Sequence, residues 1–225
     1  MAKRDRTKVL RNSIITFVAA LVTVVLGYGL VYITGATESD VIVEGKHYRT
    51  LDRPAVTDPI EVIEFFSYVC IHCKTFEPAI DEWKVTLPSE VQFTRKHVSF
   101  SPETSMLSRA HLALQHLQAI DQNHSRIFNA IHDRNKQFNT VDQIADFVDG
   151  YGVNRTAFLN AFNGRRISLL SEQSRREWSE YRLSGTPALV VGNKYVINTG
   201  IGRAQSLAVV DKLIAELLSK TSPNS

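Results

Sequence analysis

Cys70 and Cys73 are the only two cysteines of this 225-residue chain, and they lie three positions apart. A pair with this spacing can cycle between dithiol and disulfide, supply half of a zinc site, or form a structural disulfide. A zinc site needs further ligands, and the chain has no other cysteine to supply them. The zinc site that can still be formed combines Cys70, His72 and Cys73 with a distant histidine. A disulfide across so short a loop removes little chain entropy, which makes a structural role the weaker explanation.

The residues on either side of the cysteines favour redox chemistry. Residues 61–67, EVIEFFS, form a short apolar run typical of a buried strand. After the pair, Phe76, Ile80 and Trp83 recur at helical spacing. The cysteines therefore open a helix, where free N–H groups and a partial positive charge favour a thiolate over a thiol.

This placement predicts different roles for the two thiols. Cys70, at the start of the helix, is expected to have a lowered pKa and to act as nucleophile and leaving group. Cys73, one turn along, is expected to be more buried and to act as the resolving thiol. His72 lies between them and can add a hydrogen bond or a positive charge. Because stabilisation of the reduced form makes the disulfide oxidising, we expect the protein to donate its disulfide to a substrate dithiol.

Glu64 lies in the middle of the predicted strand, and we expect it to be buried and close to the cysteines. A buried carboxyl has a raised pKa and can transfer protons during thiol exchange. The alternative is a structural ion pair between Glu64 and Arg95, which Glu77 can join. The remaining histidines are scattered along the sequence and are interpreted as structural or surface residues: His47, His97, His111, His116, His124 and His132.

Thr186 and Pro187 precede a predicted hairpin. A proline at this place can simply mark the boundary of a strand. In thioredoxin-type folds the same place carries a cis proline that faces the CxxC motif. In that case the backbone of Thr186 can pair with an extended substrate segment and hold it against Cys70.

The predicted elements follow the order strand, helix, strand, helical block, hairpin, helix. After the first helix, strands are predicted at residues 91–100, 187–191 and 194–197. The closing helix is predicted at residues 207–218. Within the helical block, Thr140 and Gln143 form a predicted capping box, and Asn154 is a predicted N-cap. Two residues, 192–193, are predicted to turn the hairpin.

This order predicts an α/β fold with a thioredoxin-like core and a helical insertion domain, preceded by one N-terminal transmembrane helix. The core is assigned to residues 45–100 and 179–219, and the insertion to residues 101–178. Residues 14–33 carry no charge over 20 positions, which at 1.5 Å per residue spans about 30 Å. A transmembrane anchor is therefore predicted at residues 14–34.

The competing interpretation of this apolar segment is a cleaved signal peptide with a cleavage site at Thr34-Gly35-Ala36. Residues 1–13 form a basic tail that should stay in the cytoplasm, and residues 35–44 form a linker. Either interpretation places the body of the chain outside the cytosol, which in a bacterium is the periplasm. Disulfides persist in that compartment.

The charge of the chain excludes one class of function. The formal net charge is +3, but residues 1–11 carry five basic side chains against one acidic side chain. The rest of the chain therefore has no basic excess that would favour binding to nucleic acid. With 44% hydrophobic and 22% charged residues, the composition is that of an ordinary globular protein.

Taken together, these motifs resemble the DsbA family of bacterial thiol:disulfide oxidoreductases. The resemblance covers roughly residues 45–217. The matching segments are Ile63-Glu-Phe-Phe-Ser67, Cys70-x-His-Cys73, Phe76-Glu77, Thr94-x-x-His-Val98, Thr186-Pro187-Ala188 and Asn193-Lys-Tyr195. Three features depart from the family pattern: Ile71 replaces a proline, Thr186 replaces a valine, and the predicted anchor replaces a cleaved signal.

The resemblance implies an enzyme that introduces disulfide bonds into exported proteins and needs no cofactor or metal. It implies catalytic roles for Cys70, Cys73 and His72, supporting roles for Glu64, Glu77 and Arg95, and substrate binding by Thr186 and Pro187. It also implies reoxidation by a DsbB-type partner in the bacterial inner membrane, with the catalytic domain in the periplasm. The alternatives are an anchored reductase or isomerase of the same fold, and a non-enzymatic peptide- or metal-binding protein.

Overall fold

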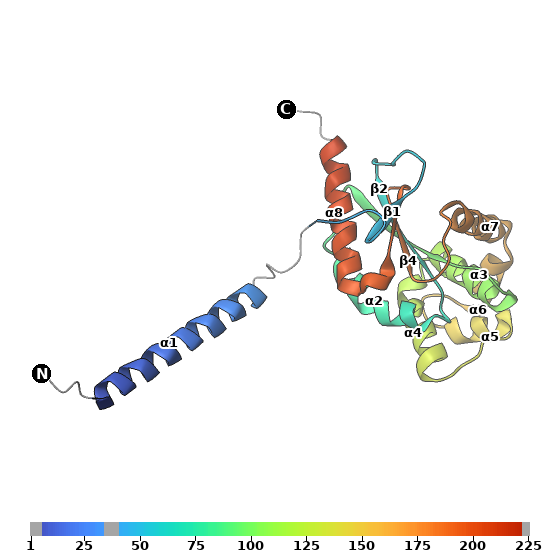
Figure 1. Cartoon of the computed structure of the whole chain (residues 1–225). Helices are drawn as coiled ribbons and strands as arrows, with labels where there is room; N and C mark the ends of the chain where they lie inside the picture. Colours follow the sequence, from blue (N-terminus) through green and yellow to red (C-terminus); the bar gives the residue numbers. More distant parts are fainter. Residues whose placement is uncertain (1–5, 34–40, 222–225) are drawn as a thin grey trace, which may run out of the picture. The chain divides into compact units, whose positions relative to one another are not determined.

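The computed structural model describes residues 6–33 and 41–221 of the chain, and it separates into two compact units, residues 1–42 and 43–225. The first unit contains one helix among its described residues, α1 (Arg6–Ile33) (Figure 1). Residues 10–27 of α1 have a mean hydropathy of 1.8, so the helix is long and apolar enough to cross a membrane. Residues 1–5, the proposed cleavage site at 34–36 and most of the predicted linker lie outside the described residues.

The second unit is built on a five-stranded mixed sheet with the strand order β1-β5-β4-β2-β3. The central strand β2 runs parallel to β3 and antiparallel to β4, and β5 pairs antiparallel with both β4 and β1. The strand bounds are β1 (Tyr48–Thr50), β2 (Ile60–Phe66), β3 (Val91–His97), β4 (Ala188–Val191) and β5 (Tyr195–Ile197).

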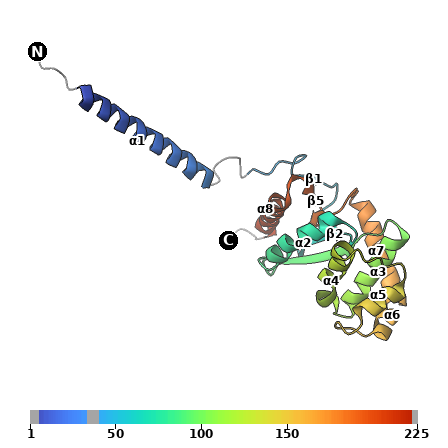
Figure 2. The same ribbon diagram turned by 90° about the horizontal axis from the view of Figure 1, so that it is seen from below.

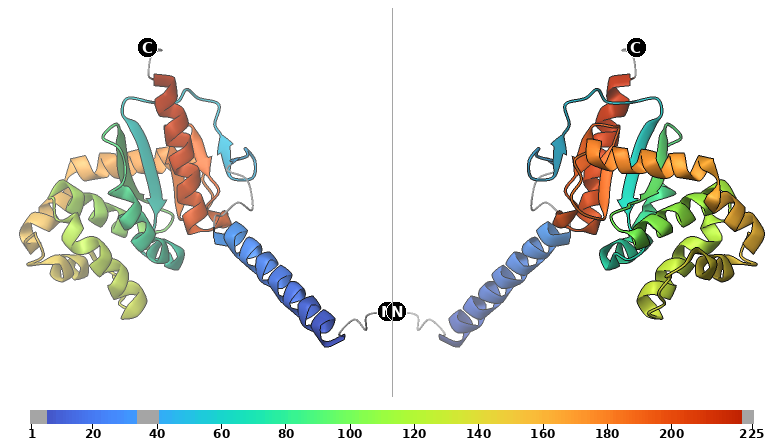
Figure 3. Two further views of the ribbon diagram at one scale, coloured as in Figure 1. Left: turned by 90° about the vertical axis from the view of Figure 1, so that its left-hand side faces the viewer. Right: turned by 90° about the vertical axis from the view of Figure 1, so that its right-hand side faces the viewer.

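Seven α-helices are described in this unit together with a short 3-10 helix, η1 (Thr199–Ile201). They are α2 (Ile71–Lys84), α3 (Pro102–His116), α4 (Ile120–Asp133), α5 (Val141–Val148), α6 (Arg155–Asn163), α7 (Arg165–Glu180) and α8 (Arg203–Thr221). Helices α3 to α7 are consecutive and interrupt the order of strands between β3 and β4. Figure 3 shows α3 to α6 grouped on one side of the sheet.

Successive side chains of β2 point to opposite faces of the sheet, and their contacts show which face α2, α7 and α8 cover. Phe65 packs against Trp178 and Tyr181 at the C-terminal end of α7, so α7 covers the face toward which Phe65 points. Glu64 points to the other face and meets a salt-bridge network that includes Glu77 of α2. Helix α8 packs against α2 on that side (Figure 2). There, Trp83 Nε1 donates to Asp211 Oδ1 at 2.7 Å.

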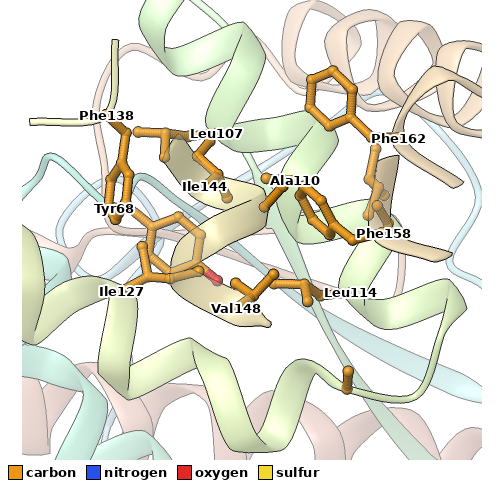
Figure 4. Packing of buried hydrophobic residues seen from close by; sticks show 14 of the residues in the cluster. Tyr68, Leu107, Ala110, Leu114, Ile127, Phe138, Ile144, Val148, Phe158 and Phe162 are labelled. Atoms are coloured by element: carbon orange, nitrogen blue, oxygen red, sulfur yellow. The ribbon is translucent and has the colours of Figure 1, made fainter. Parts of the chain in front are cut away.

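A continuous apolar core joins the sheet to the helical block. Phe66 and Tyr68 at the end of β2 belong to the same buried cluster as Leu107 of α3 and Phe128 of α4. Figure 4 shows Tyr68 beside Ile127, with its hydroxyl directed into this cluster. Burial of these side chains stabilises the block against the sheet, because each fully buried large apolar side chain contributes about 1.5–3 kcal/mol.

The structure confirms the predicted thioredoxin-like fold, with differences at element boundaries. The strand predicted at 91–100 ends at His97. Phe100 instead donates its N–H to Thr104 Oγ1 at 2.8 Å, within the capping box that starts α3. Thr140 caps α5, but the side chain of Gln143 accepts from the N–H of Asn139 rather than from that of Thr140.

The hairpin turn also differs from the prediction. Val191 pairs with Tyr195, so three residues rather than two separate the paired positions. Gly192 and Asn193 have φ of 55° and 60°, in the left-handed region of backbone conformation. Glycine adopts this region because it has no Cβ atom, and asparagine tolerates it better than most other residues. The N–H of Lys194 donates to Val191 O at 3.1 Å and closes the turn.

Candidate active site

Cys70 occupies the N-cap position of α2, directly after the loop that follows β2. Its backbone is extended, with φ of −91° and ψ of 113°, and its sulfur accepts a hydrogen bond from the N–H of Cys73 at 3.4 Å. The Cys70 N–H donates to Ser67 O at 3.0 Å, which fixes the loop between strand and helix. The thiol therefore lies at the positive end of a helix, as expected from the sequence.

The loop before β4 lies against this sulfur. The peptide bond between Thr186 and Pro187 is cis, and the Cys70 sulfur lies 3.4 Å from the Thr186 carbonyl oxygen. Thr199 of η1 donates its hydroxyl to Pro187 O at 2.8 Å and so links the proline to the segment after the hairpin. Two segments more than 100 residues apart in the sequence thus meet at Cys70.

The two thiols have opposite electrostatic environments. The hydrogen bond from the Cys73 thiol lowers the pKa of Cys70 to about 5, with further contributions from Thr186 and from the backbone of His72 and Cys73. The same hydrogen bond and burial raise the pKa of Cys73. Cys73 is fully buried, whereas Cys70 is partly exposed. At neutral pH the reduced site therefore carries one accessible thiolate and one buried thiol.

His72 is exposed. It lines a hollow of about 530 Å³ together with Thr186, Pro187 and Arg203. Val69 and Ile71, on either side of Cys70, are 38% and 49% exposed. The partly exposed Cys70 thus has an exposed apolar residue on each side in the sequence, and Thr186, which lies against its sulfur, also lines the hollow.

Below this surface, Glu64, Glu77 and Arg95 form a buried group that we name the carboxylate cluster. Glu64 Oε2 accepts from Arg95 Nε at 2.9 Å, and Glu77 Oε2 lies 3.0 Å from Arg95 Nη2. Asp81 contacts the same nitrogen at 3.2 Å. Burial raises the pKa of Glu64 to about 7, although the charge of Arg95 opposes the shift.

The position of the carboxylate cluster refines the expectation for Glu64. In the described part of the chain, the side chain of Glu64 forms its hydrogen bond and ion pair with Arg95 rather than with either cysteine. Glu77 lies one helical turn beyond Cys73 on the same buried face of α2, which connects the cluster to the active-site helix. The three supporting residues are therefore brought together, and a role for Glu64 in proton transfer stays a prediction.

A second buried group, of one tyrosine and three histidines, was not predicted from the sequence. Its members, which we name the histidine cluster, are Tyr68, His97, His111 and His124. The Tyr68 hydroxyl lies 3.1 Å from His111 Nδ1 and 3.0 Å from His124 Nδ1. The Tyr68 N–H donates to His97 Nε2 at 2.9 Å. These histidines are far apart in the sequence but gather around one tyrosine two residues before Cys70, where they have a structural role.

Two histidines of this cluster, His97 and His111, are held in the neutral form. Burial lowers the pKa of His97 to about 3 and places the pKa of His111 well below its ordinary value. Because His97 Nε2 accepts from Tyr68, its Nδ1 carries the proton and donates to Val98 O at 2.7 Å. His124 Nε2 lies 2.8 Å from Glu77 Oε2 and joins this cluster to the carboxylate cluster.

One sequence signal could have indicated that these histidines are buried. His111 falls on the apolar stripe of α3 with Leu107 and Leu114, and His124 falls on that of α4 with Ile127 and Phe128. A histidine within such a stripe points into the core. His132, also on α4, donates to Tyr68 O at 2.9 Å. Among the described residues, no group of three His, Cys, Asp or Glu side chains is arranged to hold a metal ion.

Comparison with known proteins shows the family of this chain. The model of the DSBA-like thioredoxin domain matches residues 61–214. The chain belongs to this family. It is 32% identical to the thiol:disulfide interchange protein DsbA of Pseudomonas aeruginosa over 210 residues, which is 91% of this chain and 96% of that protein. It is 34% identical to DsbA of Azotobacter vinelandii over 159 residues, 70% of this chain and 74% of that protein.

Solved structures of DsbA proteins give the same result. The crystal structure of Pseudomonas aeruginosa DsbA is similar with a TM-score of 0.76 at 32% identity, covering 81% of this chain and 97% of that one. The oxidoreductase DsbA from Xylella fastidiosa has a TM-score of 0.74 at 28% identity, covering 79% and 98%. This DsbA-like chain is therefore a thiol:disulfide oxidoreductase with a thioredoxin-like fold.

Proposed function

We propose that this DsbA-like oxidoreductase introduces disulfide bonds into exported proteins through the Cys70-Ile71-His72-Cys73 site. The observation that carries the direction is the thiolate of Cys70, whose pKa of about 5 stabilises the reduced form at neutral pH. Stabilisation of the reduced form raises the tendency of the disulfide to accept two electrons from a substrate. A reductase needs the opposite balance.

The exchange proceeds in two thiolate attacks. A substrate thiolate attacks the Cys70 sulfur of the oxidised site, and Cys73 leaves and is protonated because its pKa is raised. A second substrate thiolate then attacks the substrate sulfur of the mixed disulfide and displaces Cys70 as a stable thiolate. The substrate loses two electrons, and the enzyme ends as a dithiol.

The cis-proline loop is the proposed docking site for the substrate. Because the Thr186 carbonyl lies beside the Cys70 sulfur, an extended segment that bonds to the Thr186 backbone brings its cysteine next to Cys70. The exposed Val69 and Ile71 offer apolar contacts to unfolded chains. His72 is proposed to assist catalysis from the rim of the site, where it is accessible to substrate.

The redox equilibrium with glutathione tests the direction. We expect the Cys70–Cys73 disulfide to be more oxidising than that of thioredoxin, whose potential is about −270 mV. Thiolate absorbance against pH should give a pKa for Cys70 near 5. A potential near or below the thioredoxin value would contradict an oxidase and favour the reductase or isomerase alternative.

Variants of the two cysteines test the assignment of roles. Cys70→Ser should abolish oxidation of a reduced model protein. Cys73→Ser should retain the reactive thiolate and accumulate mixed disulfides with substrates, which mass spectrometry can identify. If Cys70→Ser leaves oxidation intact, the Cys70–Cys73 pair does not carry the reaction, and the proposal fails.

Helix α1 is proposed to anchor the enzyme in the bacterial inner membrane, with the catalytic domain in the periplasm and a DsbB-type protein as its oxidant. The support is the apolar stretch at residues 10–27 and the basic residues that precede it. Membrane fractions washed with carbonate should retain the full-length chain. Release of a shortened soluble protein, with a new N-terminus near residue 36, would show a cleaved signal instead.

A further inference from the structure

Two hollows flank the cis-proline loop and share three residues, Thr186, Pro187 and Thr199. The first is the hollow of about 530 Å³ on the His72 side. The second measures about 440 Å³ and lies between this loop, the edge strand β1 and β5. A peptide that crosses Thr186 next to Cys70 can therefore extend into both hollows.

The charged side chains that line these hollows are all basic. Arg203 lines the first hollow, and Arg49 and Arg182 line the second. None of the described residues lining either hollow is an aspartate or a glutamate. The net charge of the chain outside its N-terminal tail is close to zero, so this concentration of positive charge is local.

Arg49 and Arg182 form a pair of like charges, and neither has an ion pair with a carboxylate in the part of the chain that the structure describes. Burial and the charge of Arg182 lower the pKa of Arg49, and no acidic group contributes to that shift. One nitrogen of Arg49, Nη2, donates to the carbonyl oxygens of Tyr181 and Arg182 at 2.5 and 2.9 Å. The guanidinium of Arg49 is thus fixed in place, and its remaining N–H groups can face a ligand.

The ends of the helices explain part of this arrangement but not all of it. Arg49 caps the carbonyls at the C-terminus of α7, which is a structural role. Arg49 already donates to the carbonyl groups at this end of α7, yet the residue after the C-cap Tyr181 is a second arginine, Arg182. Arg182 has φ of 51°, a conformation in which glycine or asparagine is usual after a helix. An exposed arginine at such a position adds charge to the hollow where a smaller residue would fit the backbone better.

We propose that the two hollows bind carboxylate side chains that flank the reacting cysteine, so that the preferred substrates are acidic segments of polypeptide. This inference rests on the proposed function and specifies its substrate class. A carboxylate between Arg49 and Arg182 offsets their mutual repulsion and can accept hydrogen bonds from both guanidinium groups. Complementary charge also accelerates encounter with the substrate.

The test uses three peptides, each with one pair of cysteines and with both termini blocked, so that only side chains differ. The residues within three positions of the first cysteine are glutamate, glutamine or lysine. The rate at which each reduced peptide consumes the Cys70–Cys73 disulfide is measured by acid quenching and mass spectrometry. We expect the glutamate peptide to react about tenfold faster than the lysine peptide at low salt. This ratio should approach one in 1 M salt, where charges are screened beyond about 3 Å.

Variants of Arg182 assign the preference to the hollow. Arg182→Glu should remove the preference for the glutamate peptide, measured relative to the glutamine peptide. Arg182→Asn tolerates the same backbone conformation and should reduce the preference without reversing it. The matched control is Arg166→Glu, which makes the same change of net charge at an exposed position of α7 outside both hollows. The control should keep the full preference.

The outcomes separate the substrate class from the enzymatic function. If the three peptides are oxidised at equal rates, the enzyme is an oxidase without this preference, and the inference fails alone. A preference that survives Arg182→Glu, or that Arg166→Glu also removes, overturns the assignment to the hollow. If the oxidised protein reacts with none of the peptides, the proposed function itself fails.

Discussion

The carboxylate cluster and the histidine cluster lie under the same two cysteines. They differ in how the energetic cost of burying their polar side chains is reduced. The first places a cation among carboxyl groups, since Arg95 contacts Glu64, Glu77 and Asp81. The second avoids charge, because burial keeps His97 and His111 neutral. Glu77 belongs to the first cluster and bonds to His124 of the second. The two clusters are therefore connected to each other through a residue of the active-site helix.

The two clusters respond to pH in opposite directions. The pKa of Glu64 is raised from 4.5 to about 7, so its protonated form contributes stability that is complete below pH 4.5 and is lost as pH rises through 7. The pKa of His97 is lowered from 6.5 to about 3, so its neutral form contributes stability above pH 6.5 that is lost as pH falls through 3. Between pH 4.5 and 6.5 the two effects partly cancel.

The largest effect is expected from removing the shared cation of the carboxylate cluster. Arg95→Met removes the guanidinium that contacts both buried carboxyl groups, those of Glu64 and Glu77. Breaking a buried ion pair by removal of one partner costs about 3–5 kcal/mol. We expect a loss of this size in the free energy of unfolding at pH 7, measured by urea denaturation.

The matched control for Arg95 is Arg155→Met. Arg155 also contacts two aspartates, Asp142 and Asp146, but at the surface. Exposed pairs of this kind contribute about 0–1 kcal/mol. Equal losses in the two variants would show that burial does not distinguish the two networks, contrary to the comparison.

A smaller effect is expected from the centre of the histidine cluster. Tyr68→Phe keeps the ring but removes the hydroxyl that lies against His111 and His124. Leaving buried polar atoms without a partner costs about 1–3 kcal/mol. Tyr151→Phe, at a residue that is 46% exposed, is the control and should change the unfolding free energy by less than about 0.5 kcal/mol. A neutral result for Tyr68→Phe would mean that its hydroxyl is not an essential partner of the two histidines.

The smallest effect should appear only as a difference in pH dependence. Glu64→Gln removes the group that loses stability as pH rises from 4.5 to 7, while Arg95 keeps Glu77 and Asp81 as partners. The variant should therefore become more stable relative to the natural protein at pH 8 than at pH 5, in urea titrations at both values. Glu82→Gln, at an exposed position of α2, should run parallel to the natural protein. Parallel curves for Glu64→Gln would contradict the raised pKa.

Local features of the sequence determined much of the site. The apolar run before Cys70 and the helical spacing after it place the thiol at the start of α2, because strand and helix periods are properties of neighbouring residues. The motifs that resemble the DsbA family, with Thr186 and Pro187 among them, were equally readable. The end of β3 was not, because Ser101 and Thr104 cap the next helix and take up the backbone that would extend the strand.

Tertiary structure alone decided which distant groups meet. His97, His111 and His124 come from β3, α3 and α4, and nothing in their spacing shows that two of them share the hydroxyl of Tyr68 and the third accepts its backbone N–H. Arg49 and Arg182 are likewise far apart in the sequence and become adjacent only when β1 joins the sheet beside the end of α7. Periodicity reports which side of an element is buried, whereas contacts between elements depend on how the whole chain packs. The sequence therefore determined the reactive pair, and the fold determined the two buried clusters beneath it and the basic hollows beside it.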